Sequence, residues 1–221
     1  MSRLFRSTHH PFDPVWPVQL ALIFALSLQL LLPDKFTIGL HYMLAWVEGL
    51  LIISLSVTTP RAHTFRSLRR RVNVIILIAT IILANAYSLI VVADQLLQPG
   101  VVSDGRAVIL TAINIFLTNI IIFALWYWEM DGGGPGERRG IQKHEQDFLF
   151  APHRNELYKH PKWHPTFGDY LYLSATNAMA FSPSDVLPLS LRAKMLMLCQ
   201  AMVSGVTIIL VAARAVGILS S

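Results

Sequence analysis

Residues 167–185 read FGDYLYLSATNAMAFSPSD, and this stretch decides how the rest of the chain is interpreted. It is apolar but too short to cross a bilayer comfortably, because a spanning helix needs about 20 apolar residues. Asp169 lies near its start and Asp185 at its end, and a long apolar run follows directly. The pattern predicts a re-entrant half-helix that enters a membrane, turns at the Ser-Pro-Ser corner and leads into a spanning helix. The alternative is a short packed helix whose corner plugs the bundle.

The composition of the whole chain predicts an all-α integral membrane protein. Only 14% of the 221 residues are charged, whereas soluble domains average about 25%. A soluble bundle would need helices that are apolar on every face, which suits lipid and not water. The net charge is +5, but its arginines cluster between apolar runs. We therefore expect the lipid bilayer as partner and no binding of nucleic acid.

Five apolar runs predict about five transmembrane helices, with the half-helix before the last. Pro33, Pro60 and Pro99 follow the first three runs and mark where those helices end. The predicted spans are 15–32, 36–58, 72–97, 107–128 and 189–219. The chain then divides into an N-terminal tail (1–14), a four-helix membrane region (15–130), a polar cytoplasmic loop (131–165), and the half-helix with the last span (166–221). The run Gly132-Gly133-Gly134-Pro135-Gly136 predicts a flexible start to the loop.

Lysine and arginine near the span ends predict the orientation, because cytoplasmic loops carry an excess of them. The tail, the segment 61–71 with five arginines, and the loop 131–165 are all basic. Two predicted spans separate each basic segment from the next. All three can therefore lie on the cytoplasmic side, with the N-terminus inside and the C-terminus outside.

Polar residues within the predicted spans have both a functional and a structural interpretation. Glu48 lies in the middle of an apolar helix, where a carboxylate costs about 2.5–3.5 kcal/mol on insertion scales, so it should face the bundle or a cavity. It could handle ions or protons, or be a protonated structural acid. Asn85, Asn119 and Ser204 lie near the centres of their spans. They could join Glu48 in one polar layer, or act as hydrogen bonds between helices, which we favour.

Two sets of candidate residues follow. The candidate pore or polar-layer residues are Glu48, Asn85, Asn119, Asp169, Thr176, Asn177, Ser182, Ser184 and Asp185. Small residues spaced four apart let helix backbones approach closely, and the candidate packing residues are Ala201, Gly205, Ala213 and Gly217. Gln200 and Ser204 share a face with the first pair. Asp185 could also cap the last helix.

The sequence offers no motif for a metal site, a cofactor site or an enzyme active site. Its one cysteine, Cys199, lies in an apolar run. His160 and His164 have metal-ligand spacing, but Pro161 and Pro165 prevent the helix that would align them. Phosphate-loop, zinc-protease and nucleophile-elbow patterns are absent from the sequence. We expect no metal, no cofactor and no catalysis.

Several features resemble an uncharacterised family of bacterial multipass membrane proteins of unknown function. They are His10-Pro11, the arginines at 69–71, the aromatic run Trp126-Tyr127-Trp128, and the segments 169–172 and 181–185. The resemblance covers most of the chain. It implies a bacterial inner-membrane protein and brings no known activity.

Residues 167–218 also resemble the pore loop and inner helix of potassium channels. The resemblance rests on Asp169 to Thr176 and on Ser184 to Pro188. It implies a homo-oligomer around a path for small cations or protons. The filter glycines are missing, and stacked filter carbonyls depend on them. Potassium selectivity of the usual kind is therefore not expected. Two hypotheses remain: an ion- or proton-conducting protein, and a non-conducting structural or partner-binding membrane protein.

Overall fold

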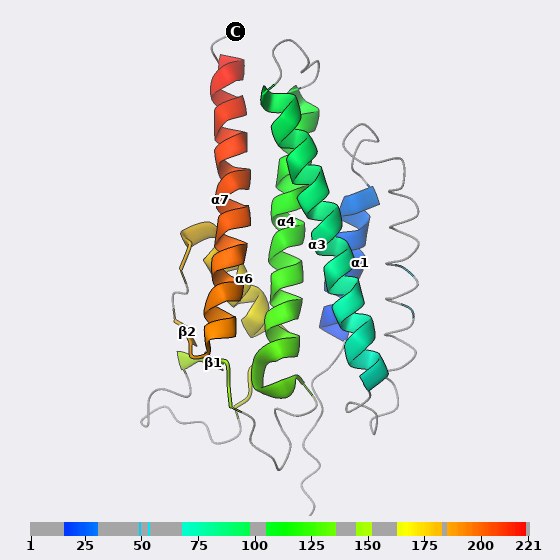
Figure 1. The fold of residues 1–221 in the computed structure, drawn as a ribbon, viewed down its shortest axis with the longest axis vertical. Coiled ribbons are helices and arrows are strands. Elements are labelled where there is room, and N and C mark those ends of the chain that lie inside the picture. Colours follow the sequence, from blue (N-terminus) through cyan, green and yellow to red (C-terminus); the bar gives the residue numbers. More distant parts are fainter. Residues whose placement is uncertain are drawn as a thin grey trace, which may run out of the picture.

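The computed structural model is a bundle of long helices with a short helix and a small two-stranded sheet toward one end (Figure 1). The structure describes residues 16–30, 49, 53, 68–97, 105–135, 145–151, 163–182 and 185–219. The elements are α1 (Trp16–Leu30), α3 (Leu68–Leu97), α4 (Gly105–Met130), the 3-10 turn η2 (Asp131–Gly133), β1 (Phe148–Leu149), α6 (Phe167–Ala180), β2 (Leu187–Pro188) and α7 (Leu191–Leu219).

Three of the described helices are long and apolar enough to cross a membrane. Their apolar spans are Val74–Asp94, Val108–Gly133 and Leu191–Ala213, and the helix at Trp16–Leu28 is apolar but shorter. The prediction of a predominantly helical membrane protein is therefore confirmed. The predicted second span, 36–58, lies almost wholly outside the described residues and Glu48 lies entirely outside them, so the total of five spans stays a prediction.

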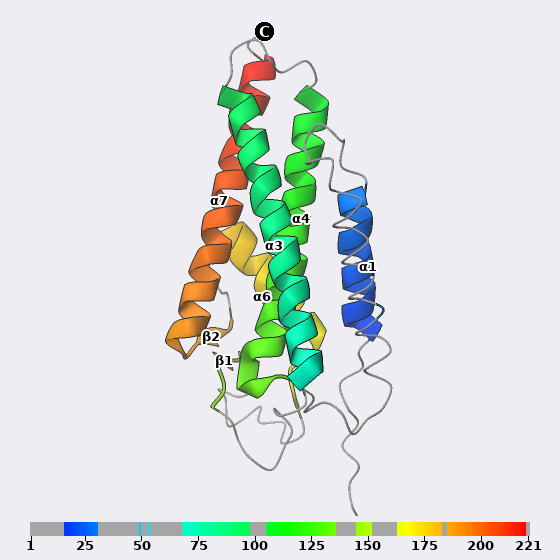
Figure 2. The ribbon, with the colours of Figure 1, turned by 45° about the vertical axis from the view of Figure 1, so that its right-hand side comes forward.

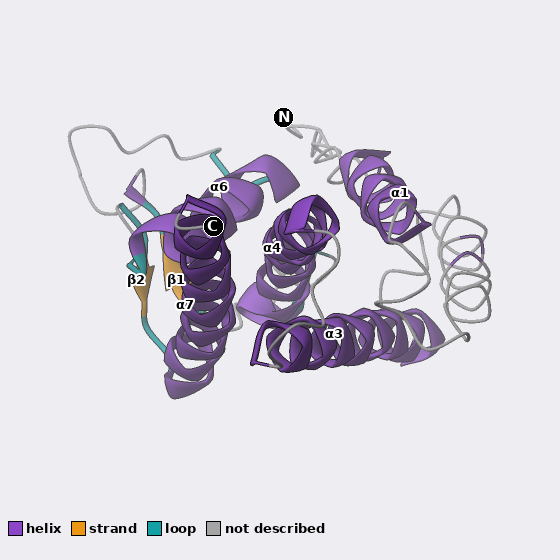
Figure 3. Cartoon of the chain, turned by 90° about the horizontal axis from the view of Figure 1, so that it is seen from above, coloured by secondary structure: helices purple, strands orange, loops and turns teal. Residues whose placement is uncertain are grey.

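Helix α4 occupies the centre of the bundle. It contacts α1, α3, α6 and α7 (Figure 3), and 72% of its apolar span is buried, against 33% for α3 and 22% for α7. Helices α3 and α7 consequently present apolar side chains outward, such as Leu83 and Ile209. Such an outer surface suits contact with lipid or with another apolar helix.

The long helices alternate in direction. Helices α3 and α7 begin at the end of the bundle that holds β1 and β2, and α4 ends there (Figures 1 and 2). Helix α6 begins near the same end and runs obliquely toward the middle of α7. After Phe181 the chain returns to β2 and to the start of α7. Both ends of the segment from α6 to α7 thus lie toward one end of the bundle.

The segment 145–150 folds back onto the bundle. Strand β1 pairs with β2 in antiparallel register, Phe148 opposite Pro188. The ring centroids of Phe148 and Tyr127 lie 5.2 Å apart, and those of Phe150 and Tyr170 also lie 5.2 Å apart. Phe148 and Phe150 are buried. This part of the predicted polar loop therefore belongs to the hydrophobic core, which its overall polarity concealed.

Helix α6 has a defined start and an unusual end. The Asp169 carboxylate accepts hydrogen bonds from the backbone N–H and the hydroxyl of Thr166, at 2.7 and 2.8 Å. Thr166 and Asp169 thus form a capping box, which is typical of a helix N-terminus. At the other end, Phe181 adopts the left-handed conformation with φ 55°, which glycine or asparagine usually occupies at helix ends. The helix therefore stops at a fixed point, well before it is long enough to cross a bilayer.

The cap of α7 differs from the sequence expectation. Ser190, and not Asp185, occupies the capping position, where its Oγ accepts a hydrogen bond from the Ala193 N–H at 3.2 Å. Asp185 lies five residues earlier and is exposed. The intervening β2 moves Asp185 out of reach of the first turn of α7.

Candidate functional site

The side chain of Gln200 is the centre of a buried hydrogen-bond network between α4, α6 and α7. Its Oε1 accepts from the Tyr127 hydroxyl at 2.5 Å and from Asn177 Nδ2 at 2.9 Å. Its Nε2 donates to the backbone oxygen and the hydroxyl of Ser174, at 3.0 and 2.6 Å. A glutamine amide has two donors and two acceptor sites, so the hydrogen-bonding capacity of Gln200 is filled.

The network continues on both sides of Gln200. Ser174 donates to the Ile120 carbonyl at 2.7 Å, and Asn177 donates to the Met197 carbonyl at 3.0 Å. Asn119 on α4 donates to the hydroxyl of Ser204 at 3.0 Å, and Ser204 lies one turn along α7 from Gln200. The network side chains are all buried. Each polar side chain named here meets a protein partner, so the network links the three helices through buried hydrogen bonds.

The predicted polar layer is therefore formed in part. Asn119 and Ser204 meet as the interhelical hydrogen bond that the sequence favoured. Asn85 is half-buried on α3, and the bond between Asn119 and Ser204 joins α4 to α7 without it. A further polar contact on α4 links Asn114 to the Leu28 carbonyl of α1. Glu48 and Ser184 lie outside the described residues.

The candidate residues on α6 do not face one common path. Asn177 points into the Gln200 network, and Asp169 caps the helix start. The Thr176 hydroxyl donates to the carbonyls of Tyr172 and Leu173, both at 3.0 Å, so it bonds its own helix. Ser182 and Asp185 are exposed beyond the helix end. We define the tip of α6 as residues 179–182. Ser182 belongs to this tip, and Asp185 follows it in the sequence.

The tip of α6 packs on the middle of α7. Gly205 is the central residue of the 29-residue α7, and the Phe181 ring lies 3.5 Å from the position that a Cβ on Gly205 would occupy. Ala201 is half-buried nearby in the sequence, Ala213 is exposed, and Gly217 lies in the last turns of α7. Gly205 thus accommodates an aromatic ring, where the sequence suggested close approach of a second helix backbone.

Substitution at Gly205 is expected to displace this tip. Gly205→Leu places a branched side chain where the Phe181 ring lies and should lower the free energy of unfolding by about 1–3 kcal/mol through overpacking. Gly205→Ala is the matched control, because its Cβ would meet the ring at ordinary van der Waals distance. Thermal unfolding in detergent measures both variants. Adding Phe181→Ala to Gly205→Leu should restore stability, and a double variant no better than Gly205→Leu alone would contradict this packing.

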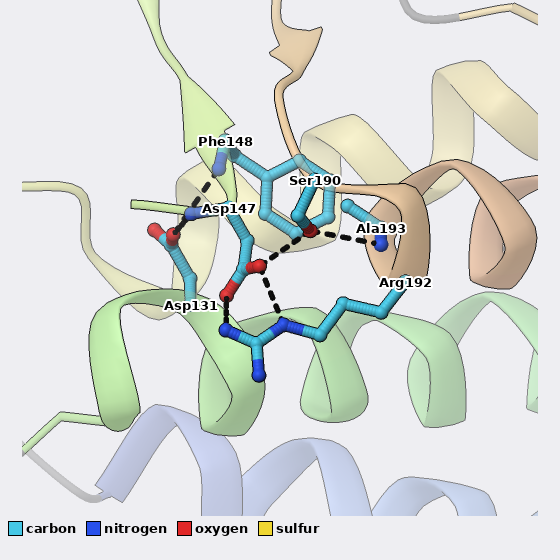
Figure 4. Close-up of polar contacts among 6 residues, drawn as sticks. All are labelled: Asp131, Asp147, Phe148, Ser190, Arg192 and Ala193. Atoms are coloured by element: carbon cyan, nitrogen blue, oxygen red, sulfur yellow. Dashed lines mark hydrogen bonds and ion pairs between the residues drawn. The ribbon is translucent and has the colours of Figure 1, made fainter. Parts of the chain in front are cut away.

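A second polar cluster closes the end of the bundle that holds the sheet (Figure 4). Asp131 Oδ1 accepts from the backbone N–H groups of Asp147 and Phe148, at 2.7 and 3.2 Å. Its Oδ2 accepts from the Tyr170 hydroxyl at 2.5 Å. Asp131 and Asp147 are each 1% exposed. The buried carboxylate of Asp131 therefore fixes β1 to the ends of α4 and α6.

Asp147 completes this cluster from the other side. Its Oδ1 accepts a hydrogen bond from the Ser190 hydroxyl. The same oxygen accepts from Arg192 Nε at 2.7 Å, and Oδ2 accepts from Arg192 Nη2 at 3.1 Å. The backbone oxygen of Asp147 accepts from the Leu189 N–H at 2.8 Å. Two-point contact between arginine and a carboxylate fixes orientation as well as distance. Asp147 thereby ties β1 to the segment that starts α7.

The glycine run beside Asp131 forms a defined turn at residues 132–134. Gly132, Gly133 and Gly134 all have positive φ, at 57°, 83° and 99°. Glycine adopts such angles without steric cost. The Gly134 N–H donates to the Asp131 carbonyl at 3.0 Å. The run forms a tight turn that reverses the chain after α4 and keeps Asp131 at the core.

Two hollows lie elsewhere on the bundle. One of about 220 Å³ lies between α3 and α4, beside Trp126 and Glu129. The other, of about 300 Å³, lies between α4 and α7 and has an apolar lining that includes Phe116 and Ile208. None of the candidate pore residues lines either hollow. Among the described residues, no group of histidine, cysteine and acidic side chains could hold a metal ion.

Comparison with known proteins gave no match, since no protein-family model, curated protein or solved structure resembles the chain significantly. The two resemblances noted in the sequence therefore rest on the quoted residues alone.

Sequence reasoning missed both polar clusters as units. It placed Gln200 and Ser204 on one face of α7, but not the partners of Gln200 on α4 and α6. A usable signal is that Ser174 and Asn177 on α6, and Gln200 and Ser204 on α7, are spaced three or four apart, which places each pair on one helix face. Asp131 and Asp147 gave no such signal.

Proposed function

We propose that the chain is a multipass membrane protein in which α6 is a re-entrant half-helix, and that small cations or protons pass along the outer side of its tip. The observation that carries the proposal is the position of α6. It begins near the end of the bundle where α7 starts, and it stops at Phe181 beside the central residue of α7. If α7 spans the bilayer, the tip of α6 lies near the middle of the hydrocarbon region.

The electrostatics of this tip favour a cation. The C-terminus of a helix carries a partial negative charge of about half an electron. The last carbonyls of α6 therefore point toward the region beyond Ala180. Ser182 and Asp185 follow in the sequence, and both are exposed; they supply a hydroxyl and a carboxyl group. The missing filter glycines favour weak selectivity among small cations.

The hydrogen-bonded network supports a path outside α6 over one between α4, α6 and α7 at the level of Gln200. The Gln200 network occupies the space between α4, α6 and α7, and its buried groups bond to each other. Opening that space for ions would break several of these hydrogen bonds. The outer side of α6 requires no such change.

The same network favours a second candidate function, a non-conducting structural or partner-binding membrane protein. In that case α6 serves to lock α4 to α7, and its exposed tip contacts another molecule. This candidate needs no water-filled path and predicts no flux.

An ion-flux assay on reconstituted protein separates the two functions. The protein in liposomes should pass protons or monovalent cations faster than protein-free liposomes do. Asp185→Asn should lower the flux several-fold, because it removes the exposed negative charge beyond the tip. Glu145→Gln is the matched control, since Glu145 is also exposed and lies outside the spans; it should leave the flux unchanged. Glu48→Gln, in the same assay, tests the predicted intramembrane acid.

Folding of each variant is checked by circular dichroism and thermal unfolding before reconstitution. Folded wild-type protein with no flux above protein-free liposomes would overturn the conduction proposal and leave the non-conducting function. Equal flux through wild type and Asp185→Asn would show that the ion path does not run past the tip of α6.

A further inference from the structure

The hollow of about 220 Å³ between α3 and α4 lies toward the end of the bundle where α3 begins and α4 ends. Its described lining residues are Ile75, Ile78 and Ala79 of α3 and Trp126, Glu129 and Met130 of α4. Each set of three has the spacing that places residues on one helix face. The hollow is therefore formed by two facing helix surfaces, and it is distinct from the tip of α6.

The hollow has an apolar rim and an acidic floor. Ile75, Ala79 and Trp126 are exposed and form the rim. Ile78 and Glu129 are only 4% and 8% exposed and form the floor. A carboxyl group thus lies at the bottom of a hollow whose opening is apolar.

The electrostatics at the floor favour a cation. Glu129 is the second-last residue of α4, whose last turn contains no basic residue. The C-terminal end of a helix carries a partial negative charge of about half an electron. The Glu129 carboxylate and the helix end therefore add their negative potentials at the floor. Because a carboxylate in apolar surroundings is costly unless it is paired, a cation bound there would be stabilised.

The rim requires an apolar body on the same ligand. The hollow lies within the apolar spans Val74–Asp94 of α3 and Val108–Gly133 of α4, so an acyl or alkyl chain suits its opening. An acyl chain alone brings no hydrogen-bond donor to the floor, and an inorganic cation brings no apolar surface to the rim. A primary ammonium group has three donors and a positive charge, and it is also attracted to the face of a tryptophan ring.

We propose that this hollow binds a primary ammonium group on an apolar chain. The ammonium lies beside the Glu129 carboxylate, and the chain lies against Ile75 and Trp126. An aminolipid headgroup and a free alkylamine both supply this chemistry. The site is independent of the ion path proposed above, because none of its lining residues belongs to that path.

Quenching of tryptophan fluorescence in dodecyl maltoside micelles, which contain no ammonium group, tests the proposal. The probe is decylamine with a nitroxide at the far end of its chain, and the reference is the same chain with a hydroxyl in place of the amine. At neutral pH the amine should quench saturably, and the alcohol only in proportion to its concentration. Glu129→Gln should weaken amine binding about tenfold, because hydrogen bonds to charged groups are the stronger ones. Glu145→Gln, at an exposed acid outside the spans, is the matched control and should leave binding unchanged.

A second variant fills the hollow without touching its acid. Ala79→Phe places a ring at the exposed rim and should abolish saturable quenching, with thermal unfolding showing that the protein is folded. Equal quenching by amine and alcohol, or unchanged binding in both Glu129→Gln and Ala79→Phe, would overturn the proposal.

Competition with lipids identifies the source of the ammonium group. Displacement of the probe by phosphatidylethanolamine, and not by phosphatidylglycerol, would identify an aminolipid headgroup. Displacement by neither lipid would identify a free alkylamine. Equal displacement by both lipids would contradict the role of the ammonium group. These outcomes do not depend on ion flux, so they test the hollow separately from the conduction proposal.

Discussion

Gln200→Leu is expected to lower the free energy of unfolding by about 3–5 kcal/mol. The substitution removes the four hydrogen bonds that the Gln200 side chain makes, and measured bonds between membrane helices average about 0.6 kcal/mol each. It also leaves the fully buried Tyr127 hydroxyl without its acceptor, at a cost of about 1–3 kcal/mol. Leucine is similar in size, so the loss reports the polar contacts and not a cavity.

Unfolding in mixed micelles with increasing denaturing detergent measures this effect. Cys199→Ser is the matched control, because Cys199 is the exposed neighbour of Gln200 on α7; it should change stability by less than about 0.5 kcal/mol. Adding Tyr127→Phe to Gln200→Leu should recover part of the lost stability, because the Tyr127 hydroxyl that has no acceptor in Gln200→Leu is then removed as well. A Gln200→Leu protein as stable as wild type would show that the network does not hold α6 in place.

Asp147→Ala is expected to detach β1 and the start of α7 from the bundle, with a loss of about 3–4 kcal/mol. The Asp147 carboxylate is buried and accepts from Ser190 and from two nitrogens of Arg192. Hydrogen bonds to charged groups contribute about 1.5–3 kcal/mol each. Arg192 itself is 64% exposed, so water can solvate it after the substitution, and the expected loss is therefore below the summed range of about 4.5–9 kcal/mol.

Hydrogen exchange locates this effect as well as measuring its size. The Leu189 amide, which donates to the Asp147 carbonyl, should exchange much faster in Asp147→Ala. The amide of Ile120 in central α4 should keep its protection. Glu145→Ala is the control, because Glu145 is exposed and lies two residues away. Unchanged protection of the Leu189 amide would mean that the pairing of β1 with β2 holds the start of α7 in place without the Asp147 side chain.

The long helices could be predicted closely from the sequence. The expected spans 72–97, 107–128 and 189–219 correspond to α3, α4 and α7 within four residues at each end. Each is a run of apolar residues, and Pro99-Gly100 stops α3 in the way that proline and glycine stop helices generally. A short helix was expected within 166–185 and forms over Phe167–Ala180, because Thr166 with Asp169 starts it and the sequence Ser182-Pro183-Ser184 follows it.

The polar contacts could be predicted only in part. Asn119 and Ser204 were expected to serve as interhelical hydrogen bonds, since polar residues at mid-span need a partner. Their pairing with each other, and the gathering of Tyr127, Ser174 and Asn177 around Gln200, depend on how α6 crosses between α4 and α7. Helix periodicity gives the face of each residue but not the helix that it meets.

The contacts of Asp131 and Asp147 could not be predicted at all. They lie in a stretch without hydrophobic periodicity, and its glycines and charges are typical of a solvated loop. What orders it is the burial of Phe148 and Phe150 against Tyr127 and Tyr170, a contact between segments far apart in the chain. Such long-range docking leaves no regular pattern in the sequence.

In the proposed topology the chain enters the bilayer through α6 and returns, before α7, to the side from which it came. Spin labels at single cysteines, in a Cys199→Ser background, measure depth from the ratio of collisions with oxygen and with a water-soluble nickel reagent. Labels at the exposed positions Tyr172, Met179, Leu187 and Leu191 sample the path. The account predicts the greatest depth at Met179, with shallower positions at Tyr172, Leu187 and Leu191. Depth that stays shallow at all four positions, or water exposure that returns only on the opposite side, would contradict it.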